Sequence, residues 1–195
     1  MPHDTTTYIS AEAYLALEER SETKHEYIDG TVVPMPGVSL QHALIVSNLV
    51  FCLRLALRLL SGYQVTASDI QVWIPARNSY VYPDVTVTAH PPIGMEQQRP
   101  FILLNPTLIV EVLSDTTAAY DRGDKFYAYQ TIDSFREYLL VDQARVHLTH
   151  HWRDAAGTWH EAHYTDQAAV VHLVSIPVTL PLVEVYADVP VATEA

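Results

Sequence analysis

Cysteine and glycine are both scarce in this sequence of 195 residues. Cys52 is the single cysteine, so no disulfide can form within the chain, and its apolar neighbours favour a small core residue. The six glycines form neither a Walker-type phosphate loop nor a dinucleotide fingerprint. The Gly-x-Ser-x-Gly motif of serine hydrolases is missing as well. These absences argue against nucleotide-dependent enzymes and serine hydrolases.

Positive charge is also scarce. The chain has 11 lysines and arginines against 23 aspartates and glutamates, which gives a formal net charge of −12. Proteins that hold nucleic acid through its phosphates usually present a basic face, so this balance argues against a general nucleic-acid binder. An enzyme that acts on DNA would therefore depend on bound divalent cations and on a local group of arginines.

Signals for export and for a membrane are missing from the sequence pattern. Met1–Thr5 has neither the basic nor the apolar region of a secretory signal, which predicts a cytoplasmic protein. The longest apolar stretch, Leu49–Leu60, is interrupted by Arg54 and Arg58, so we expect no membrane span. With 49% hydrophobic and 17% charged residues, residues 1–195 are expected to form one globular domain.

Hydrophobic periodicity and turn residues predict alternating helices and strands. Helices are expected at Ala11–Arg20 after the N-cap Ser10, at Leu40–Leu60 and at Ala118–Thr131. Strands are expected at Tyr63–Ile74, Tyr82–Thr88, Thr107–Leu113 and Glu137–Val141, with a tight hairpin at Asp29-Gly30 and a loop at His90–Pro100. The helix Leu40–Leu60 is apolar on nearly all sides, which predicts burial or an interface.

The last third of the chain alternates polar and apolar residues. This pattern in Val146–Arg153, Thr158–Tyr164 and Val170–Val174 predicts an antiparallel meander. The order of elements predicts an α/β fold of mixed α+β character, in which helices flank a mixed central β-sheet.

Two acids lie inside strand-like runs. Asp84 follows Tyr82-Pro83, and Glu111 interrupts the apolar run Thr107–Leu113. Side chains alternate along a strand, so both carboxylates can converge on one point if the two strands are neighbours. Two such acids suit Mg²⁺ or Mn²⁺, which take oxygen ligands and keep waters for hydrolysis. Asp84 can instead be an ordinary turn acid. Glu111, desolvated on a buried strand, needs a salt-bridge partner or a metal.

Lys125 is one of two lysines, the other being Lys24. Asp121, Lys125 and Tyr129 are spaced by four residues and share one helical face. Lys125 either forms a surface pair with Asp121 or points over the end of the Glu111 strand, where its amine would orient the attacking water. Two further residues stay open in the same way. Glu26 adds a third carboxylate to the metal or pairs with Lys24 or an arginine, and His42 contacts a phosphate or water or caps its helix.

Five histidines near the C-terminal strands suggest zinc at first sight: His147, His150, His151, His160 and His163. No cysteine or acid completes a recognisable ligand motif among them. We therefore expect exposed histidines on a hairpin.

An ordered set of short motifs resembles a known family. The motifs are Asp29-Gly30, His42, Pro83-Asp84, Val110-Glu111-Val112-Leu113-Ser114, Asp121…Lys125…Tyr129, Glu137–Asp142 and the closing Leu180–Tyr186. Together they are similar to the putative restriction endonuclease family of the PD-(D/E)XK nuclease superfamily. The resemblance covers about Tyr8 to Val189, nearly the whole chain.

The resemblance implies a restriction-endonuclease-like core, often assembled as homodimers. It also implies Asp84 and Glu111 as metal ligands, with Glu26 as a further acid of the site. The superfamily lysine stands two residues after the second acid, where this chain has Leu113. The resemblance assigns its role to Lys125 on the following helix.

The predicted function is therefore a Mg²⁺- or Mn²⁺-dependent endonuclease acting on DNA. Its catalytic residues would be Glu26, Asp84, Glu111 and Lys125, and its metal ligands Asp84, Glu111 and Glu26. The alternative is a dimeric interaction module that keeps the fold without cutting DNA, which the acidic charge and Leu113 favour. No membrane partner is expected.

Overall fold

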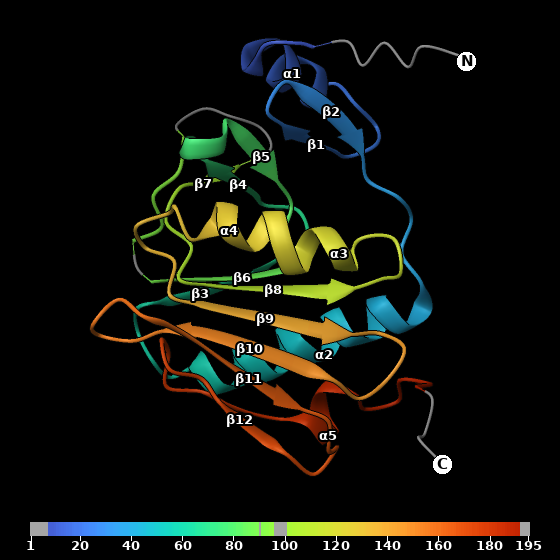
Figure 1. The fold of residues 1–195 in the computed structure, drawn as a ribbon, viewed down its shortest axis with the longest axis vertical. Helices are drawn as coiled ribbons and strands as arrows, with labels where there is room; N and C mark the ends of the chain where they lie inside the picture. The colour runs from blue at the N-terminus through green and yellow to red at the C-terminus, as the bar shows by residue number, and fades with distance from the viewer. Residues whose placement is uncertain (1–7, 90, 96–100, 192–195) are drawn as a thin grey trace.

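A six-stranded mixed sheet forms the centre of the protein. The computed structural model describes residues 8–89, 91–95 and 101–191 (Figure 1). From edge to edge the strands of this sheet are β11 (Trp159–Tyr164), β10 (Leu148–Arg153), β9 (Glu137–Asp142), β8 (Leu108–Leu113), β6 (Val85–Ala89) and β3 (Tyr63–Ala67). β8 and β9 are parallel, and the other neighbours are antiparallel. The predicted fold class, a mixed sheet flanked by helices, is confirmed.

A second, five-stranded sheet contains the N-terminal part of the chain. Its strands are β2 (Thr31–Pro34), β1 (His25–Ile28), β5 (Ser79–Val81), β4 (Gln71–Ile74) and β7 (Ile102–Leu103). β1 and β2 form the predicted hairpin, in which Asp29 and Gly30 have positive φ values of 43° and 92°. Both turn residues thus adopt the conformation that the Asp-Gly pair favours. The 3₁₀ helix η1 (Pro75–Arg77) forms the turn between β4 and β5.

One face of the six-stranded sheet is covered by the long helix α2 (Leu40–Leu57) and the C-terminal segment. That segment contains β12 (Val170–His172), β13 (Thr179–Pro181) and the short helix α5 (Leu182–Val185). Ile45, Leu49, Leu53 and Leu57 of α2 are buried against this face. They recur every four residues, so they form one stripe of the helix and build the first hydrophobic core.

The opposite face of the sheet is covered by a helix in three parts. These are α3 (Ala118–Tyr120), the π-helix η2 (Asp121–Lys125) and α4 (Phe126–Tyr129). Figure 1 shows them lying between the two sheets. Alternate residues of β8 serve the two faces: Leu108, Val110 and Val112 belong to the first core, and Ile109 and Leu113 to the second. Glu111 therefore points toward the three-part helix.

The N-terminal helix α1 (Ala11–Glu18) begins at the predicted N-cap. The Ser10 side chain accepts a hydrogen bond from the backbone N–H of Ala13. Tyr14 of α1 stacks on Tyr27 of β1, with ring centroids 5.0 Å apart, and both rings are fully buried. This aromatic contact attaches α1 to the five-stranded sheet.

Two predicted strands are wrong in their extent, because each crosses from one sheet to the other. The run Tyr63–Ile74 is divided into β3 and β4, which lie in different sheets. The run Tyr82–Thr88 contains only β6, since Tyr82, Pro83 and Asp84 connect it to β5 of the other sheet. Pro83 has no N–H to offer a strand ladder, which favours a break there.

The predicted meander is correct for part of its length. β9, β10 and β11 are consecutive antiparallel neighbours, but β12 pairs with β13 in a separate two-stranded sheet. The third predicted strand therefore leaves the meander and covers the first core. Of the predicted loop His90–Pro100, His90 and residues 96–100 lie outside the described residues, and 91–95 contain a single bridge, from Gly94 to Leu103.

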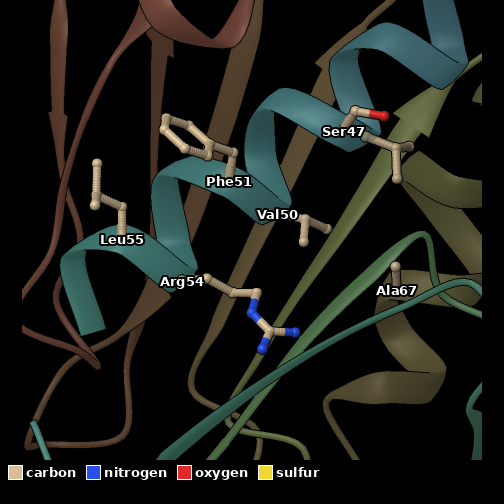
Figure 2. Close-up of a pocket in the computed structure, with 7 residues that line it drawn as sticks. Ser47, Val50, Phe51, Arg54, Leu55 and Ala67 are labelled. Carbon is tan, nitrogen blue, oxygen red and sulfur yellow. The ribbon is translucent and has the colours of Figure 1, made fainter. Parts of the chain in front are cut away.

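The helix α2 contains most of the apolar stretch for which no membrane span was expected, and that expectation stays a prediction. Its 18 residues have a mean hydropathy of 1.6, so length and composition alone would allow it to cross a membrane. The same test is passed by core helices of soluble proteins, and one stripe of α2 does pack on the sheet. On its other side Phe51 and Leu55 are exposed and stand next to each other (Figure 2). One stripe of the helix is thus core, and its outer side exposes apolar side chains to solvent.

Candidate active site

Asp84 and Glu111 meet because β6 and β8 are antiparallel neighbours. Val85 lies opposite Val110 in this pair, so the next position along the ladder places Asp84 beside Glu111. The backbone N–H of Asp84 lies 3.4 Å from Glu111 Oε2. The condition under which the sequence allowed the two acids to converge, neighbouring strands, is therefore met, although Asp84 comes just before β6 and not within it.

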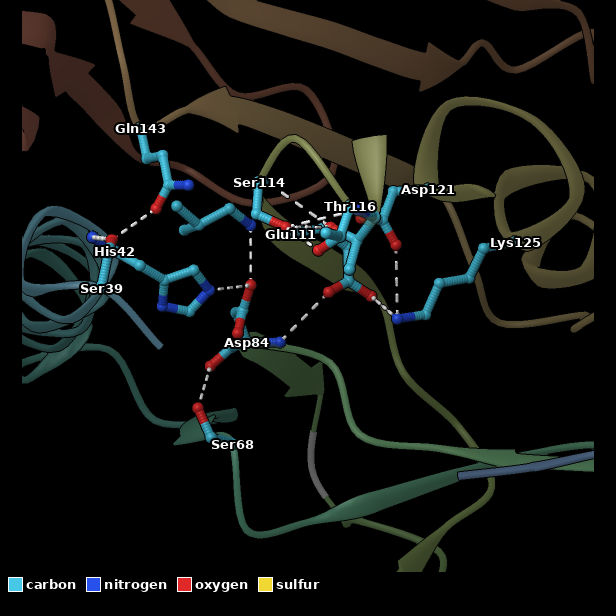
Figure 3. A network of polar contacts seen from close by, with 12 residues as sticks. Ser39, His42, Ser68, Asp84, Glu111, Ser114, Thr116, Asp121, Lys125 and Gln143 are labelled. Carbon is cyan, nitrogen blue, oxygen red and sulfur yellow. Dashed lines mark hydrogen bonds and ion pairs between the residues drawn. The ribbon is translucent and has the colours of Figure 1, made fainter. Parts of the chain in front are cut away.

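Asp84 is held in place through one of its oxygens. Asp84 Oδ2 accepts a hydrogen bond of 2.7 Å from the backbone N–H of Val112, and Nε2 of His42 lies 3.2 Å from the same oxygen (Figure 3). His42 is in the first turn of α2, and Ser39 caps this helix by accepting from the His42 N–H. The cap is therefore Ser39, and the imidazole of His42 is free to reach the acid.

The amine of Lys125 lies among three carboxylates. Lys125 Nζ is 3.0 Å from Glu111 Oε1, 3.3 Å from Glu26 Oε1 and 3.5 Å from Asp121 Oδ1. The lysine side chain is 6% exposed. The alternative of a surface pair with Asp121 is therefore wrong, since the pair with Asp121 is buried and is the longest of three contacts.

The π-helix η2 positions Lys125. In a π-helix the hydrogen bond spans five residues, one more than in an α-helix, and such turns are frequent at functional sites. Asp121 begins this segment and Lys125 ends it, and both side chains are buried. One turn later, the Tyr129 hydroxyl donates a hydrogen bond of 2.9 Å to Glu111 Oε1. The shared helical face expected for these three residues thus points at Glu111.

Glu26 reaches the same cluster from the other sheet. It lies on β1, and its Oε1 accepts a hydrogen bond of 3.1 Å from the backbone N–H of Tyr82 in addition to the contact with Lys125. Lys24 pairs with Asp69 instead, so the alternative pairing of Glu26 with Lys24 is wrong. The cluster therefore joins the two sheets.

Charge in the cluster is out of balance, because three carboxylates surround one amine and Asp84 adds a fourth acid next to Glu111. Burial raises the pKa of Glu111 well above its usual range. Lys125 opposes this shift, and Asp121, Asp84 and Glu26 add to it. Burial lowers the pKa of the Lys125 amine, but Glu111, Glu26 and Asp121 outweigh it and hold the pKa well above its usual range. Lys125 is therefore charged, and the site attracts further positive charge.

The acids fit a hard cation in chemistry and in number. Among the residues that the structure describes, no three His, Cys, Asp or Glu side chains are grouped so as to hold a metal ion. Mg²⁺ is usually held by one or two carboxylates together with water and substrate phosphates. Asp84 Oδ2 and Glu111 Oε1 accept the anchoring bonds from Val112 and Tyr129. Asp84 Oδ1, together with Glu111 Oε2 and its long 3.4 Å contact to the Asp84 N–H, would provide that smaller set.

A cavity of about 570 Å³ lies over the cluster. Glu26, His42, Asp84, Glu111, Asp121 and Lys125 line it together with Tyr82 and Tyr120. Another part of the wall is formed by the end of β2 and the segment that joins it to α2, Val33 to Ser39. All the catalytic and metal-binding residues predicted from the sequence thus lie in one cavity, and their chemical roles stay predictions.

Three further residues of the site were not assigned to it from the sequence. His42 was left between a phosphate contact and a helix cap, Tyr129 was noted only for its spacing, and Tyr120 was not singled out. The four-residue spacing of Asp121, Lys125 and Tyr129 was a usable signal. Tyr120 gave none. Leu113, two residues after Glu111 and on the same face of β8, packs in the second core and is 3% exposed.

The expectation of exposed hairpin histidines is partly wrong. His160 and His163 are exposed, but His150 and His151 are buried on β10. His150 Nε2 lies 2.6 Å from Glu137 Oε1, a fully buried acid. His151 stacks on Phe126 with centroids 4.4 Å apart. Alternation alone missed this, because the three-part helix and the C-terminal segment cover both faces of the sheet at this strand.

The chain matches a family model of almost the same extent. The model is that of the Uma2 family, described as "Putative restriction endonuclease", and it matches residues 11–183. The chain belongs to the Uma2 family. The family resemblance predicted from the short motifs is thereby confirmed.

Two relatives of this Uma2 protein come from Synechocystis sp. The uncharacterized protein sll1609 is 36% identical over 158 residues, which are 80% of this chain and 86% of that protein. The uncharacterized protein slr1290 is 39% identical over 123 residues, or 62% of each chain. Both similarities concern sequence only.

A solved structure with the same fold comes from Anabaena variabilis. It is the crystal structure of a putative nuclease belonging to DUF820, and it superposes with a TM-score of 0.75 at 17% identity. The match covers 92% of this chain and 98% of that one. At this identity the likeness concerns the fold, so this Uma2 chain shares the fold of that nuclease.

Proposed function

We propose that this Uma2 protein is a divalent-metal-dependent endonuclease that hydrolyses phosphodiester bonds of DNA. The observation that carries the proposal is the pair Asp84 and Glu111 with the Lys125 amine 3.0 Å from Glu111. Two carboxylates beside a fixed positive charge offer ligands for a cation and a donor for a phosphate in one place. Membership of a family described as restriction endonuclease supports the same activity.

Asp84 and Glu111 would hold Mg²⁺ or Mn²⁺, with Glu26 bound directly or through water. Carboxylate oxygens are the ligands that these cations prefer. When bound, the cation would activate water and stabilise negative charge on the phosphate. Its positive charge would also relieve the repulsion among Glu26, Asp84, Glu111 and Asp121, the repulsion that helps to raise the pKa of Glu111.

Lys125 acts in this proposal as a charged donor that orients the attacking water. An ammonium group has three N–H donors, and three carboxylates lie within 3.5 Å of Nζ. The raised pKa of Lys125 keeps it protonated, so it does not serve as the base. Its contact with Asp121 is the longest of the three, so that donor is the one most easily transferred to water or a phosphate oxygen.

The residues behind the acids keep them in position. The Val112 N–H and His42 hold Asp84, and the Tyr129 hydroxyl holds Glu111. Partners of this kind orient metal ligands, and their loss typically lowers metal affinity or activity by about 10- to 100-fold. His42 and Tyr129 are therefore positioning residues in this proposal.

A nuclease assay with Asp84→Asn tests the proposal. Asparagine has nearly the same shape but lacks the charge, so we expect the Mg²⁺-dependent cleavage rate of DNA to fall by at least about 100-fold, more than for a supporting residue. Asp69→Asn is the matched control, because Asp69 is an exposed acid paired with Lys24 outside the cavity. Supercoiled plasmid and single-stranded circular DNA serve as substrates.

Calorimetry with Mn²⁺ separates the nuclease from the inactive module. The nuclease proposal requires binding heat in the wild type that Asp84→Asn abolishes and Asp69→Asn retains. Wild-type protein that cleaves neither DNA and binds no Mn²⁺ through Asp84 would contradict the proposal and favour the module.

We also propose that the protein is a homodimer whose copies meet at the outer side of α2. The family resemblance implies dimers, and α2 exposes Phe51 and Leu55, at 62% and 44%, on neighbouring turns (Figure 2). A second copy would remove this apolar surface from water. The net charge of −12 disfavours the anionic surface of a membrane as the alternative occupant.

A further inference from the structure

The acid cluster lies at the floor of a cavity, and this limits which nucleic acid can reach it. The side chains of Glu111, Asp121 and Lys125 are each 5% or 6% exposed. The cavity above them has a volume of about 570 Å³. Cavities of roughly 300–1,000 Å³ hold single small molecules. A nucleotide unit fits this space, whereas an intact duplex does not enter it.

The walls of the cavity suit a nucleobase. On one side the end of β2 and the segment that follows it contribute Val33, Pro34, Met35, Pro36 and Val38, an almost continuous apolar surface. The rings of Tyr82 and Tyr120 also line the cavity.

Tyr120 links this wall to the acid cluster, since Lys125 Nζ lies 5.8 Å from the centre of its ring. Aromatic side chains stack on bases of single strands regardless of sequence. A base against Tyr120 would thus place its phosphate near the amine of Lys125.

The charge of the lining also disfavours a duplex. The described residues that line the cavity include no arginine, and Lys125 is their single lysine. Duplex DNA is held mainly by many lysine and arginine contacts to phosphates along its surface. The cavity offers one such group, already surrounded by carboxylates, so contacts to the base must provide more of the binding.

We propose that the site accepts single-stranded DNA, one nucleotide unit at a time, with Tyr120 as the residue on which the base stacks. This proposal rests on the nuclease function and specifies its substrate class. A displaced strand, a gap or a free end enters the cavity, the base packs between Tyr120 and the apolar segment, and the phosphate reaches Lys125.

Binding and cleavage measured separately test the proposal. Fluorescence anisotropy at one salt concentration, with Ca²⁺ in place of Mg²⁺, compares a single-stranded thymidine oligonucleotide with a blunt hairpin duplex of equal length. We expect the single strand to bind at least about tenfold more tightly. Tyr120→Ala should weaken single-strand binding by about tenfold through the loss of one stacking contact, and Tyr120→Phe should bind as the wild type does.

Tyr127→Ala is the matched control, since Tyr127 is a 60% exposed tyrosine of the neighbouring α4 that does not line the cavity. Duplex binding as tight as single-strand binding would overturn the proposal, as would equal losses in Tyr120→Ala and Tyr127→Ala or the absence of single-strand binding. Cleavage of duplex without preference for single strands overturns the substrate class and leaves the nuclease standing. Single-strand binding through Tyr120 without any cleavage overturns the nuclease and leaves the binding preference.

Discussion

The buried amine of Lys125 connects both sheets and the three-part helix through its contacts with Glu26, Glu111 and Asp121. A buried ion pair contributes little net stability compared with apolar residues, but removing one partner leaves charges without compensation. Lys125 is therefore a structural requirement of this arrangement as well as a candidate catalytic group.

Replacing each lysine in turn tests this requirement. Lys125→Met leaves three buried acids without their positively charged partner, and we expect the free energy of unfolding to fall by about 3–5 kcal/mol. Lys24→Met removes an exposed pair with Asp69, and we expect a loss of about 0–1 kcal/mol. Urea denaturation of the two variants and the wild type provides the comparison. Equal losses in the two variants would show that the buried acids do not need the charge of Lys125.

His151 makes stability depend on pH at the residue scale. Burial lowers its pKa, His150 and His163 lower it further, and Glu161 opposes them. Its folded-state pKa thus lies below the unfolded value of about 6.5, so the unfolded chain binds more protons as the pH falls. The contribution of neutral His151 to stability is present above pH 6.5 and is lost as the pH falls through 6.5 toward the folded-state pKa.

The variant His151→Phe isolates this contribution. Phenylalanine can stack on Phe126 as His151 does, but it does not titrate. We expect the melting temperature of the wild type to fall more steeply than that of His151→Phe between about pH 7 and pH 5. Melting curves that fall in parallel would contradict the assignment.

At the scale of elements, the π-helix η2 decides where Lys125 points. A π-turn acts like one residue inserted into an α-helix, and such an insertion rotates every later side chain by about 100° around the helix axis. The four-residue spacing of Asp121, Lys125 and Tyr129 was read from the sequence as ordinary α-helix. The extra residue in the turn had no signal in that pattern.

Deleting Gly123 tests the role of η2. Removal of one residue favours a regular α-helix and changes the angle between the Asp121 and Lys125 side chains, so Lys125 turns away from Glu111. We expect the free energy of unfolding to fall by about 3–5 kcal/mol, because the buried acids lose their partner. Gly123→Ala is the control, because a Cβ at Gly123 meets open space and alanine favours helix by up to about 1 kcal/mol. Urea denaturation measures both. A deletion variant as stable as the wild type would mean that the π-turn does not position the lysine.

At the scale of the whole molecule, α2 has two different sides. Its buried stripe belongs to the first core, while Phe51 and Leu55 face outward. The sequence prediction allowed either burial or an interface; the structure buries one stripe of the helix, and an interface on its outer side stays a prediction. The outer side of α2 is the surface that the proposed dimer would use.

Light scattering after size exclusion tests the dimer. Phe51→Asp places a charge in the centre of the proposed contact, and we expect the dimer to dissociate to monomers. Val174→Asp is the control, because Val174 is 55% exposed in the loop after β12 and does not line the surface around Phe51 and Leu55. A wild-type protein of monomer mass would contradict the proposal, as would a Phe51→Asp variant that stays dimeric.

Local signals in the sequence determined most of the elements. Ser10 before α1, Asp29-Gly30 in the first hairpin and the apolar run of β8 around Glu111 act through neighbouring residues, so each predicted its element correctly. The acids Asp84 and Glu111 could be singled out for the same reason, since a charge on a buried strand needs a partner. Family membership also followed from motifs along the chain.

Tertiary structure alone decided how these parts meet. The runs Tyr63–Ile74 and Tyr82–Thr88 read as single strands because their alternation continues, yet each passes from one sheet to the other. Glu26 and His42 joined the cluster through contacts with residues 99 and 42 positions away in the chain, and no local pattern reports such distances. The acid pair was thus visible in the sequence, whereas the buried amine, its π-turn and the enclosing cavity depend on packing between distant segments.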